Sequence, residues 1–359
     1  MTGKSMLVTG SSGFIGSQCV RHFDQLGWEV HGIDNNMRIV FLGPAGDAAP
    51  VTERLIRDCR RFHAHDIDIR FRDGILELMR DIRPSLIVHC AAQSAQVVSK
   101  DVPFDDFDTN ATGTMNVLEA VRRFSAESPF IFLSTNRVYG DAPNELPLTE
   151  LETRWDYAHP EHREGIDESC RIDASLHTLY GASKAAADLL VQEYGRYFNV
   201  PAVCLRASSI SGPQEIGTEP HGFLAYLARC IRDRRPYRIY GHQGKQVRDI
   251  LHAQDLCEAI GAIYASPRAA SVYNLGGGRA NSVSVLEAIA AMEEISGYRL
   301  QTESLEESRK GDPICYISDT RKFRHDFPAW TPRHSLAEII RGCLAQPATG
   351  TAESVFAPK

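Results

Sequence analysis

The sequence predicts an α/β fold in which a doubly wound parallel sheet is joined to a smaller mixed α/β lobe. Short apolar segments alternate with helical patterns through the first 200 residues, which is typical of a parallel sheet covered by helices. A glycine-rich turn joins the first strand to the first helix, and an acidic residue follows the second strand. At 359 residues the chain exceeds the usual size of one core, so we expect about two domains.

The first strand, turn and helix occupy Ser5–Thr9, Gly10–Gly16 and Ser17–Leu26. The turn has the spacing GxxGxxG, in which glycines allow a tight bend and let the backbone approach a pyrophosphate. Free N–H groups at the start of the helix would bind the phosphates. A turn that serves only packing is the alternative, but the flanking strands favour a Rossmann-type dinucleotide site.

The second strand, Glu29–Ile33, ends at Asp34, 24 positions after Gly10. A carboxylate at this distance accepts hydrogen bonds from the adenosine ribose and repels a 2′-phosphate, which favours NAD over NADP. Arg38 follows four residues later, so NADP remains an alternative cofactor.

The next segments are less informative. Asn36–Thr52 is predicted to be a loop, and Glu53–Phe62 a basic helix with a solvated face. A short strand closes at His65, Asp66 and Ile67, and a buried strand, Ser85–His89, leads to small residues against which a ligand could lie. A further helix begins near Thr109.

The apolar strand Phe130–Leu133 runs into Ser134 and Thr135. Ligands of doubly wound sheets lie at the carboxyl ends of strands, so a hydroxyl here could bind a substrate alcohol. The alternative is that both hydroxyls only satisfy backbone groups of the turn.

Tyr180 and Lys184 stand four residues apart in a helical stretch that begins at Leu179, and this spacing places them on one helix face. An ammonium beside a phenol stabilises the phenolate and lowers the phenol's pKa from about 10. Tyr180 would then act as both acid and base. About half of chains this long contain such a pair by chance, so its meaning depends on the neighbouring motifs.

Leu146–Asp173 is predicted to be a long polar loop over the site.

Residues beyond the first 200 are predicted to form a substrate lobe. After the strand Pro201–Arg206 the alternation weakens, and we assign Ala253–Ala265 and Val272–Leu275 to the smaller lobe. The predicted units are a dinucleotide-binding domain (1–205), an interleaved lobe (206–345) and a disordered tail (346–359). Three arginines that could bind a diphosphate, or simply lie on the surface, are Arg206, Arg248 and Arg309.

Composition and charge limit the kinds of partner that the protein is expected to bind. The formal net charge of −7 argues against nonspecific binding to nucleic acid. No apolar stretch approaches the roughly 20 residues of a membrane span, and the N-terminus lacks a signal peptide, so we expect a cytoplasmic protein. The nine cysteines are scattered singly and histidines do not cluster at ligand spacing, so no metal site is predicted.

Three motifs stand in chain order: TGSSGFIG from Thr9, LSTNRVYGD from Leu133 and YGASK from Tyr180. With them the sequence resembles the extended short-chain dehydrogenase/reductase family of nucleotide-sugar epimerases and dehydratases over about residues 5–340. The resemblance implies that Thr135, Tyr180 and Lys184 form the catalytic set and that Asn110 is the family's helix asparagine. It also implies a homodimer, through the helix after Asn110 and the helix of Tyr180, although the alanines of the latter could equally pack on their own sheet.

Finer features resemble the CDP-paratose (CDP-tyvelose) 2-epimerase branch, among them STNRVYGD, Ile166–Ser169, Arg206–Ser209 and Gly244–Asp255. The 4,6-dehydratases carry an Asp-Glu pair after the threonine, where this chain has Asn136 and Arg137. An amide and a guanidinium cannot perform that proton transfer at neutral pH. Departures from the branch, at Ser211, Tyr240–Gly244 and Pro313, leave the sugar and the base open.

We therefore expect an NAD-dependent nucleotide-sugar epimerase that inverts a sugar carbon by transient oxidation and re-reduction. By resemblance the carbon is C2 of a CDP-linked deoxyhexose, in carbohydrate and lipopolysaccharide biosynthesis. The alternatives are a 4-epimerase or 4-ketoreductase on a UDP- or GDP-sugar, and a noncatalytic NAD-binding sensor or scaffold. The residues expected to bind the cofactor are Gly10, Ser12, Gly13, Phe14, Ile15, Gly16, Asp34, Asn35, Asn36, Arg38, Asp66, Ile67, Ala91, Ala92, Gln93, Asn110, Ser134, Tyr180 and Lys184. Those expected to bind the substrate are Gln93, Thr135, Asn136, Arg137, Ser208, Ser209, Gln246, Arg248 and Arg309.

Overall fold

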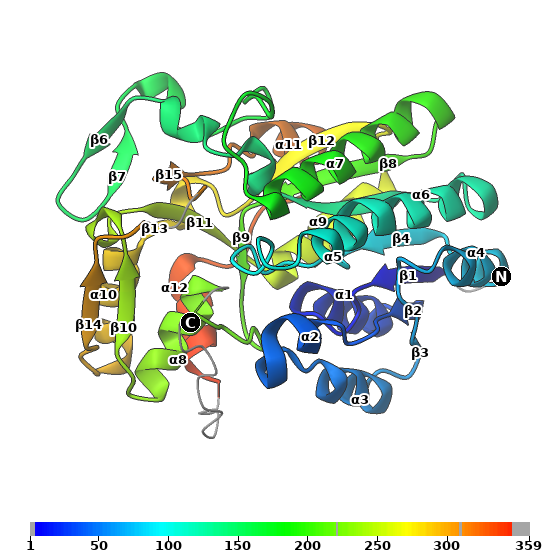
Figure 1. The fold of residues 1–359 in the computed structure, drawn as a ribbon, viewed down its shortest axis with the longest axis horizontal. Coiled ribbons are helices and arrows are strands. Elements are labelled where there is room, and N and C mark those ends of the chain that lie inside the picture. Colours follow the sequence, from blue (N-terminus) through cyan, green and yellow to red (C-terminus); the bar gives the residue numbers. More distant parts are fainter. Residues whose placement is uncertain (1–3, 220–221, 309–310, 347–359) are drawn as a thin grey trace.

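The computed structural model describes residues 4–219, 222–308 and 311–346. A seven-stranded sheet, in which all neighbouring strands are parallel, forms its centre in the order β12-β8-β5-β4-β1-β2-β3 (Figure 1). Its strands are β1 (Ser5–Thr9), β2 (Glu29–Ile33), β3 (Phe62–His65), β4 (Leu86–His89), β5 (Phe130–Thr135), β8 (Ala202–Ala207) and β12 (Ser271–Leu275). The predicted doubly wound parallel sheet is confirmed.

Helices cover both faces of this sheet, as burial of its apolar strands requires. One apolar core joins the sheet to α1 (Phe14–Gln25), α3 (Ala49–Asp58), α9 (Ala253–Ala265) and α11 (Arg321–Asp326). A second core on the other face joins it to α4 (Arg72–Ile82), α6 (Gly113–Phe124) and α7 (Leu179–Phe198). The short helices α2 (Arg38–Leu42) and α5 (Pro103–Phe107) border the carboxyl edge of the strands.

The smaller lobe has its own apolar core between α8 (Phe223–Arg232), α10 (Val285–Ser296) and α12 (Leu336–Leu344). Its short strands form a parallel pair, β10 (Tyr237–Tyr240) with β14 (Thr302–Leu305), and a mixed sheet of β9 (Ser209–Ser211), β11 (Val247–His252), β13 (Ser282–Ser284) and β15 (Cys315–Tyr316). An antiparallel hairpin, β6 (Leu148–Glu150) with β7 (Trp155–Tyr157), lies over this region (Figure 1).

Several predicted elements need correction. The region 36–52 is not only loop, because α2 lies within it and α3 begins at Ala49, with a proline in its first turn where no N–H is needed. The stretch Leu146–Asp173 contains the β6–β7 hairpin. The segments Ala253–Ala265 and Val272–Leu275 belong to the large sheet layer, because β12 pairs with β8 and α9 packs on the first core. The predicted tail beyond Gln346 lies outside the described residues.

Three histidines meet at the edge of the sheet, His31 on β2 and His63 and His65 on β3. The His31 Nδ1 and His65 Nε2 atoms are 3.0 Å apart, and the His31 and His63 rings stack with centroids 4.9 Å apart. Burial, together with the neighbouring His63 and His65, lowers the pKa of His31 from 6.5 to about 4. The folded chain therefore disfavours a proton on His31 that the unfolded chain binds readily.

We predict that His31 makes folding stability sensitive to acid. Below pH 6.5 the unfolded chain binds a proton at His31, whereas the folded chain does so only near pH 4, so stability is lost as the pH falls through this window. The loss of Tm between pH 6.5 and 4 should be smaller in His31→Gln than in the wild type. The control is His159→Gln, at an exposed side chain before the short helix that begins at Pro160, which should keep the wild-type slope. Equal slopes for His31→Gln and the wild type would contradict the prediction.

Candidate active site

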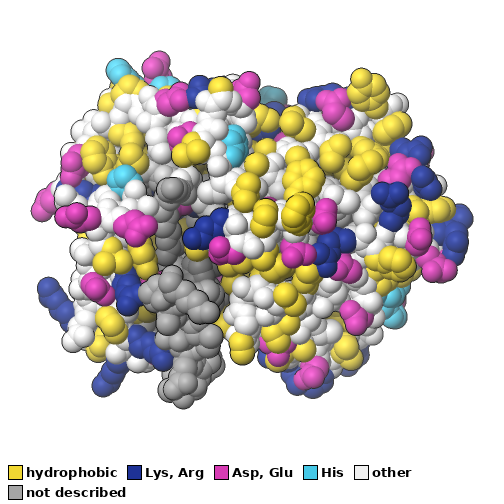
Figure 2. Space-filling model, in the orientation of Figure 1, with side chains coloured by type: hydrophobic (Ala, Val, Ile, Leu, Met, Phe, Trp, Pro, Cys, Tyr) yellow, Lys and Arg dark blue, Asp and Glu magenta, His cyan; other side chains and the backbone are white. Residues whose placement is uncertain are grey.

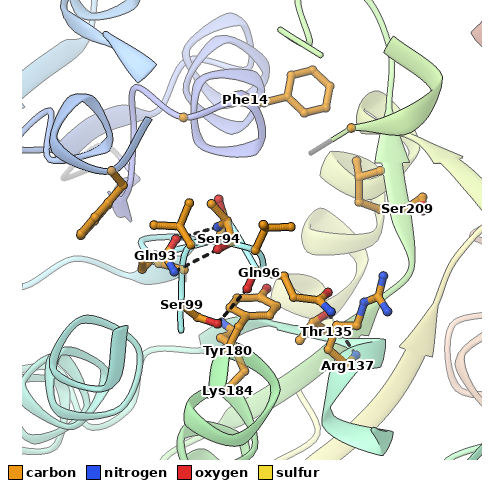
Figure 3. Close-up of a pocket in the computed structure, with 18 of the residues that line it drawn as sticks. Phe14, Gln93, Ser94, Gln96, Ser99, Thr135, Arg137, Tyr180, Lys184 and Ser209 are labelled. Atoms are coloured by element: carbon orange, nitrogen blue, oxygen red, sulfur yellow. Dashed lines mark hydrogen bonds between the residues drawn. The ribbon is translucent and has the colours of Figure 1, made fainter. Parts of the chain in front are cut away.

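A cavity of about 1410 Å³ opens between the carboxyl ends of the parallel strands and the smaller lobe (Figure 3). In a doubly wound sheet this is the edge where ligands bind. Most predicted site residues line it: Gly10, Gly13, Phe14, Ile15, Gly16, Asp34, Asn35, Arg38, Ile67, Ala91, Ala92, Gln93, Ser134, Thr135, Asn136, Arg137, Tyr180, Lys184, Ser208, Ser209, Gln246 and Arg248. The predicted residue Arg309 lies outside the described residues.

The glycine turn leaves no room for side chains between β1 and α1. Gly10 has φ +68°, and its N–H donates to the Ile33 carbonyl at 2.8 Å. A Cβ on Gly16 would lie 2.0 Å from the Gly10 carbonyl oxygen. The start of α1 therefore packs directly on the turn, which leaves its first N–H groups facing the cavity for a pyrophosphate.

Asp34 is fixed beside this turn. Its Oδ2 accepts the Ser12 N–H and its Oδ1 accepts the Asn36 N–H, both at 2.9 Å. Burial raises the pKa of Asp34, while these hydrogen bonds act in the opposite direction. The Arg38 side chain lines the same wall, and burial lowers the pKa of its guanidinium. The turn and the carboxylate together fit the adenosine end of a dinucleotide.

Four predicted cofactor residues do not line the cavity. Ser12 is buried and supports Asp34 through its backbone. The Asn36 side chain turns away to Asp47 and the backbone of Ala48. Asp66 is exposed, and its neighbours Ile67 and Asp68 line the wall instead.

Asn110, the fourth, supports the wall from behind. Its Oδ1 accepts the Gln93 N–H at 2.9 Å, and its Nδ2 donates to the Gln93 carbonyl and to Ser183 Oγ. Ser183 Oγ donates in turn to Asp106 at 2.5 Å. Asn110 therefore holds the strand end and the helix of Tyr180 together without facing the cavity.

Sequence reasoning missed several lining residues. Asp68, Glu215 and Asp312 all contribute to the wall. Glu215 follows Ser211 by four residues, and the Ser211 hydroxyl donates to its Oε2 at 2.6 Å. Burial raises the pKa of Glu215 to about 7. The departure from the branch at Ser211 was the available sign that this turn differs.

Tyr180 and Lys184 share one face of α7, as predicted, with Thr178 capping the helix through the Gly181 N–H. Tyr180 and Thr135 lie close together at the cavity floor (Figure 3). Burial raises the pKa of Tyr180 to about 12, whereas hydrogen bonding with Thr135 and the charge of Arg137 act to lower it. The predicted net lowering of the Tyr180 pKa is wrong, because burial outweighs the groups that act to lower it.

The Lys184 ammonium is held by groups other than the Tyr180 phenol. Its Nζ donates to the Leu133 carbonyl at 2.7 Å and lies 4.0 Å from the centroid of the Phe132 ring. Burial lowers the pKa of Lys184 to about 8, opposed by the negative charge of Asp188. Lys184 is thus anchored to β5 beside the cavity.

A buried ion pair lies beneath this site. The Asp188 carboxylate accepts the Ser134 hydroxyl at 2.5 Å and the Arg206 guanidinium at 2.9 and 3.2 Å. Arg206 Nη1 also donates to the Tyr139 hydroxyl at 3.1 Å. The suggestion that Arg206 could bind a diphosphate is therefore wrong, because its guanidinium is engaged in the core and does not line the cavity.

Removing this carboxylate should destabilise the protein strongly. Asp188→Ala leaves the Arg206 charge buried without its partner, which costs about 3–5 kcal/mol. The control is Glu193→Ala on the same helix, because the exposed pair of Glu193 with Arg196 is worth about 1 kcal/mol or less. Chemical unfolding of both variants measures the difference, and similar losses for the two would refute the role of Asp188.

The substrate side of the cavity carries two arginines around one carboxylate. Arg137 Nη1 lies 2.6 Å from Asp312 Oδ1 and donates to the Gly311 carbonyl at 3.0 Å. Arg248 Nη2 lies 3.9 Å from Asp312 Oδ2, and burial lowers the pKa of Arg248 to about 10. Gln246 Nε2 donates to the Tyr240 carbonyl, while its buried Oε1 has no partner among the described residues. This wall offers two cations and one free acceptor to a ligand.

Residues 6–276 match the NAD dependent epimerase/dehydratase family. The chain belongs to this family. It is 31% identical to a CDP-paratose 2-epimerase of Salmonella typhi, over 94% of this chain and 97% of that protein. A dTDP-glucose 4,6-dehydratase of Neisseria gonorrhoeae is 27% identical, over 94% of each chain. The UDP-glucose 4-epimerase of Thermus thermophilus, solved in complex with NAD, superposes with a TM-score of 0.76 at 26% identity, over 95% of this chain and 97% of that one.

The resemblance inferred from the three motifs is thereby confirmed, and the protein is an NAD-dependent enzyme of this family. The cavity wall fits the cofactor, because Gly10 and Gly16 leave a cradle that a Cβ would fill and Asp34 lies beside it. Among the described residues no helix is long and apolar enough to cross a membrane. The same part of the chain contains no group of three side chains suited to a metal ion.

Proposed function

We propose that the protein is a nucleotide-sugar epimerase that inverts one sugar carbon by transient oxidation and re-reduction, and that its substrate is CDP-paratose. The observation that carries the reaction type is the sequence of side chains at the end of β5. Thr135 is followed by Asn136 and Arg137, and the Arg137 guanidinium is held by Asp312. Neither side chain can supply the acid and base of a dehydration at neutral pH.

Each catalytic side chain has one task in this reaction. NAD, when bound, supplies the chemistry of accepting and returning a hydride. Tyr180 takes the hydroxyl proton from the sugar as the carbon is oxidised and gives it back afterwards. The Thr135 hydroxyl orients the sugar oxygen and, with the charge of Arg137, acts to lower the pKa of Tyr180, and Lys184 binds the nicotinamide ribose. Arg248 is proposed to bind the diphosphate of the substrate, and the Oε1 atom of Gln246 to accept a hydrogen bond from a hydroxyl of the same ligand.

The choice of substrate rests on the relative from Salmonella typhi, which is a CDP-paratose 2-epimerase. The test is to denature the purified protein, identify the released nucleotides by mass, and incubate the native enzyme with CDP-paratose. We expect released NAD and formation of the 2-epimer, CDP-tyvelose, seen by NMR. Conversion of UDP-glucose to UDP-galactose without reaction of CDP-paratose would instead support a 4-epimerase, as the likeness to the Thermus thermophilus enzyme suggests. Absence of turnover with all sugar nucleotides would favour a noncatalytic sensor or scaffold.

We further propose that the enzyme is a cytoplasmic homodimer formed through α5, α6 and α7. Apolar side chains gather over these helices (Figure 2), and those exposed are Phe104, Phe107, Met115, Leu179, Leu189, Tyr197 and Phe198. Contiguous apolar surface of this kind marks interaction sites. The nine cysteines, all free, fit a reducing compartment.

The dimer proposal predicts that Phe104→Asp, at a side chain that is 85% exposed, yields a monomer. Burying an unpaired carboxylate in an apolar interface costs several kcal/mol. Light scattering after size exclusion measures the mass. The matched control is Val40→Asp, at a side chain on α2 that is 72% exposed, which should remain dimeric. A wild type that elutes as a monomer would refute the interface.

A further inference from the structure

Three cysteines without a role in the proposed reaction meet beneath the glycine turn. Cys19 lies on α1, Cys257 on α9, and Cys90 directly follows β4. The Sγ atoms of Cys19 and Cys257 are 3.9 Å apart, and Cys90 packs against the apolar core that contains both, where its thiol contributes to lowering the pKa of Cys19. Three segments far apart in the sequence thus bring three thiols into one cluster, with Cys19 at its centre.

The three thiols differ in access. Cys19 and Cys257 are fully buried, whereas Cys90 is partly exposed and lines the cavity that fits NAD. A small oxidant that enters the cavity therefore meets Cys90 first. Bound NAD would cover this wall, so the cluster is open to such an oxidant only when the cavity is empty.

Hydrogen bonds within the cluster set the reactivity of its members. The Cys257 thiol donates to Cys19, and this contact, together with Cys90, lowers the pKa of the Cys19 thiol well below its usual value. The same interactions raise the pKa of Cys90 and Cys257. Cys19 is therefore the member of the cluster that loses its proton most readily, and a thiolate is the species that attacks an oxidised sulfur.

We propose that Cys90, Cys19 and Cys257 form a thiol oxidation site, which hydrogen peroxide converts to a disulfide containing Cys19 when the cofactor cavity is empty. The Cys90 sulfur, in the fraction of chains where it is a thiolate, first attacks the O–O bond and gives a sulfenic acid and hydroxide, and the hydroxide becomes water by taking up the proton lost by Cys90. The Cys19 thiolate then attacks the Cys90 sulfur, so that an S–S bond forms and the S–O bond breaks, and hydroxide leaves as water after taking the proton lost by Cys19. Two thiols lose two electrons, and the peroxide is reduced to two waters.

Cys257 provides a second partner for the same disulfide. Its sulfur lies 3.9 Å from Cys19, so thiol–disulfide exchange can replace the Cys19–Cys90 bond with a Cys19–Cys257 bond and release Cys90. Formation of the Cys19–Cys257 bond shortens the distance between the two sulfur atoms from 3.9 Å to about 2.05 Å. This shift acts beside the glycine turn, where a Cβ on Gly10 would already lie 2.8 Å from the Ala91 backbone. Oxidation should therefore weaken NAD binding reversibly.

The test treats the full chain with hydrogen peroxide, before and after saturation with added NAD. We expect the NAD-free chain to lose two of its nine thiols, and peptide mapping to find Cys19 joined to Cys90 or to Cys257. Affinity for NAD should fall at least about tenfold and return with dithiothreitol, and saturation with NAD should slow oxidation at least about tenfold. These readouts need no sugar substrate, so they stand apart from the proposed epimerase activity.

Variants identify the thiols. Cys19→Ser should abolish the disulfide, with Cys19→Ala used if the serine variant does not fold, and Cys90→Ser should slow oxidation. The matched control is Cys230→Ser, at a buried cysteine in the core of the smaller lobe, which should react like the wild type. A cross-link without Cys19, retention of all nine thiols by the NAD-free chain, or oxidation that bound NAD does not slow would each overturn the proposal.

Discussion

Tyr180→Phe is expected to lower turnover by a factor of about 10²–10⁴, the range that a positioned acid and base contributes, while NAD stays bound. The phenol is enclosed at the cavity floor beside Thr135, and burial raises its pKa to about 12. Removing the hydroxyl leaves the ring in place, so neither the glycine turn nor Asp34 moves. The measurements are the rate of epimer formation and the NAD released on denaturation, expressed per chain.

The matched control for this change is Tyr197→Phe, on the same helix at a side chain that is 79% exposed. It loses a hydroxyl from α7 without touching the cavity, so its turnover should equal that of the wild type. If Tyr180→Phe kept more than a few per cent of activity, another group would have to move the proton. If it lost NAD together with activity, the result would show a structural defect of the site.

Local pattern was enough to predict the sheet and to name three side chains that line the same cavity. The alternation of strands and helices predicted a doubly wound sheet. Each strand or helix can be recognised from the spacing of its own apolar residues, without knowledge of distant contacts. Thr135, Tyr180 and Lys184 could be named because they lie at the end of one strand and on one helix face, which short sequence spacings report directly. The glycine turn followed from the same kind of local signal.

Long-range partners could not be predicted. Arg206 looked like a ligand for phosphate because nothing near it in sequence neutralises it, and only the packing of β8 against α7 brings Asp188 to it. The same holds for Arg137 with Asp312, which lie 175 residues apart. The raised pKa of Tyr180 likewise comes from burial of the phenol, while the Lys184 ammonium binds the Leu133 carbonyl. Such contacts depend on tertiary structure that spacing does not contain.

Gly16→Ala is expected to weaken NAD binding at least tenfold and to destabilise the fold by about 1–3 kcal/mol, the range for forcing an extra methyl into a packed site. The added Cβ would lie 2.0 Å from the Gly10 carbonyl oxygen and 2.9 Å from the Ser11 Cα atom, both of them backbone. Since neither can rotate away, α1 must move from the turn and carry its free N–H groups with it. Equilibrium dialysis with NAD and thermal unfolding measure the two effects.

Gly261→Ala separates this clash from a general effect of replacing a helical glycine. Gly261 lies on α9, where an added Cβ meets nothing within 4 Å. Alanine should therefore stabilise this helix by about 0.5–1 kcal/mol and leave NAD binding unchanged. If Gly16→Ala bound NAD like Gly261→Ala, the start of α1 would not be the cradle of the pyrophosphate, and the dinucleotide would have to be held chiefly by Asp34 and the opposite wall.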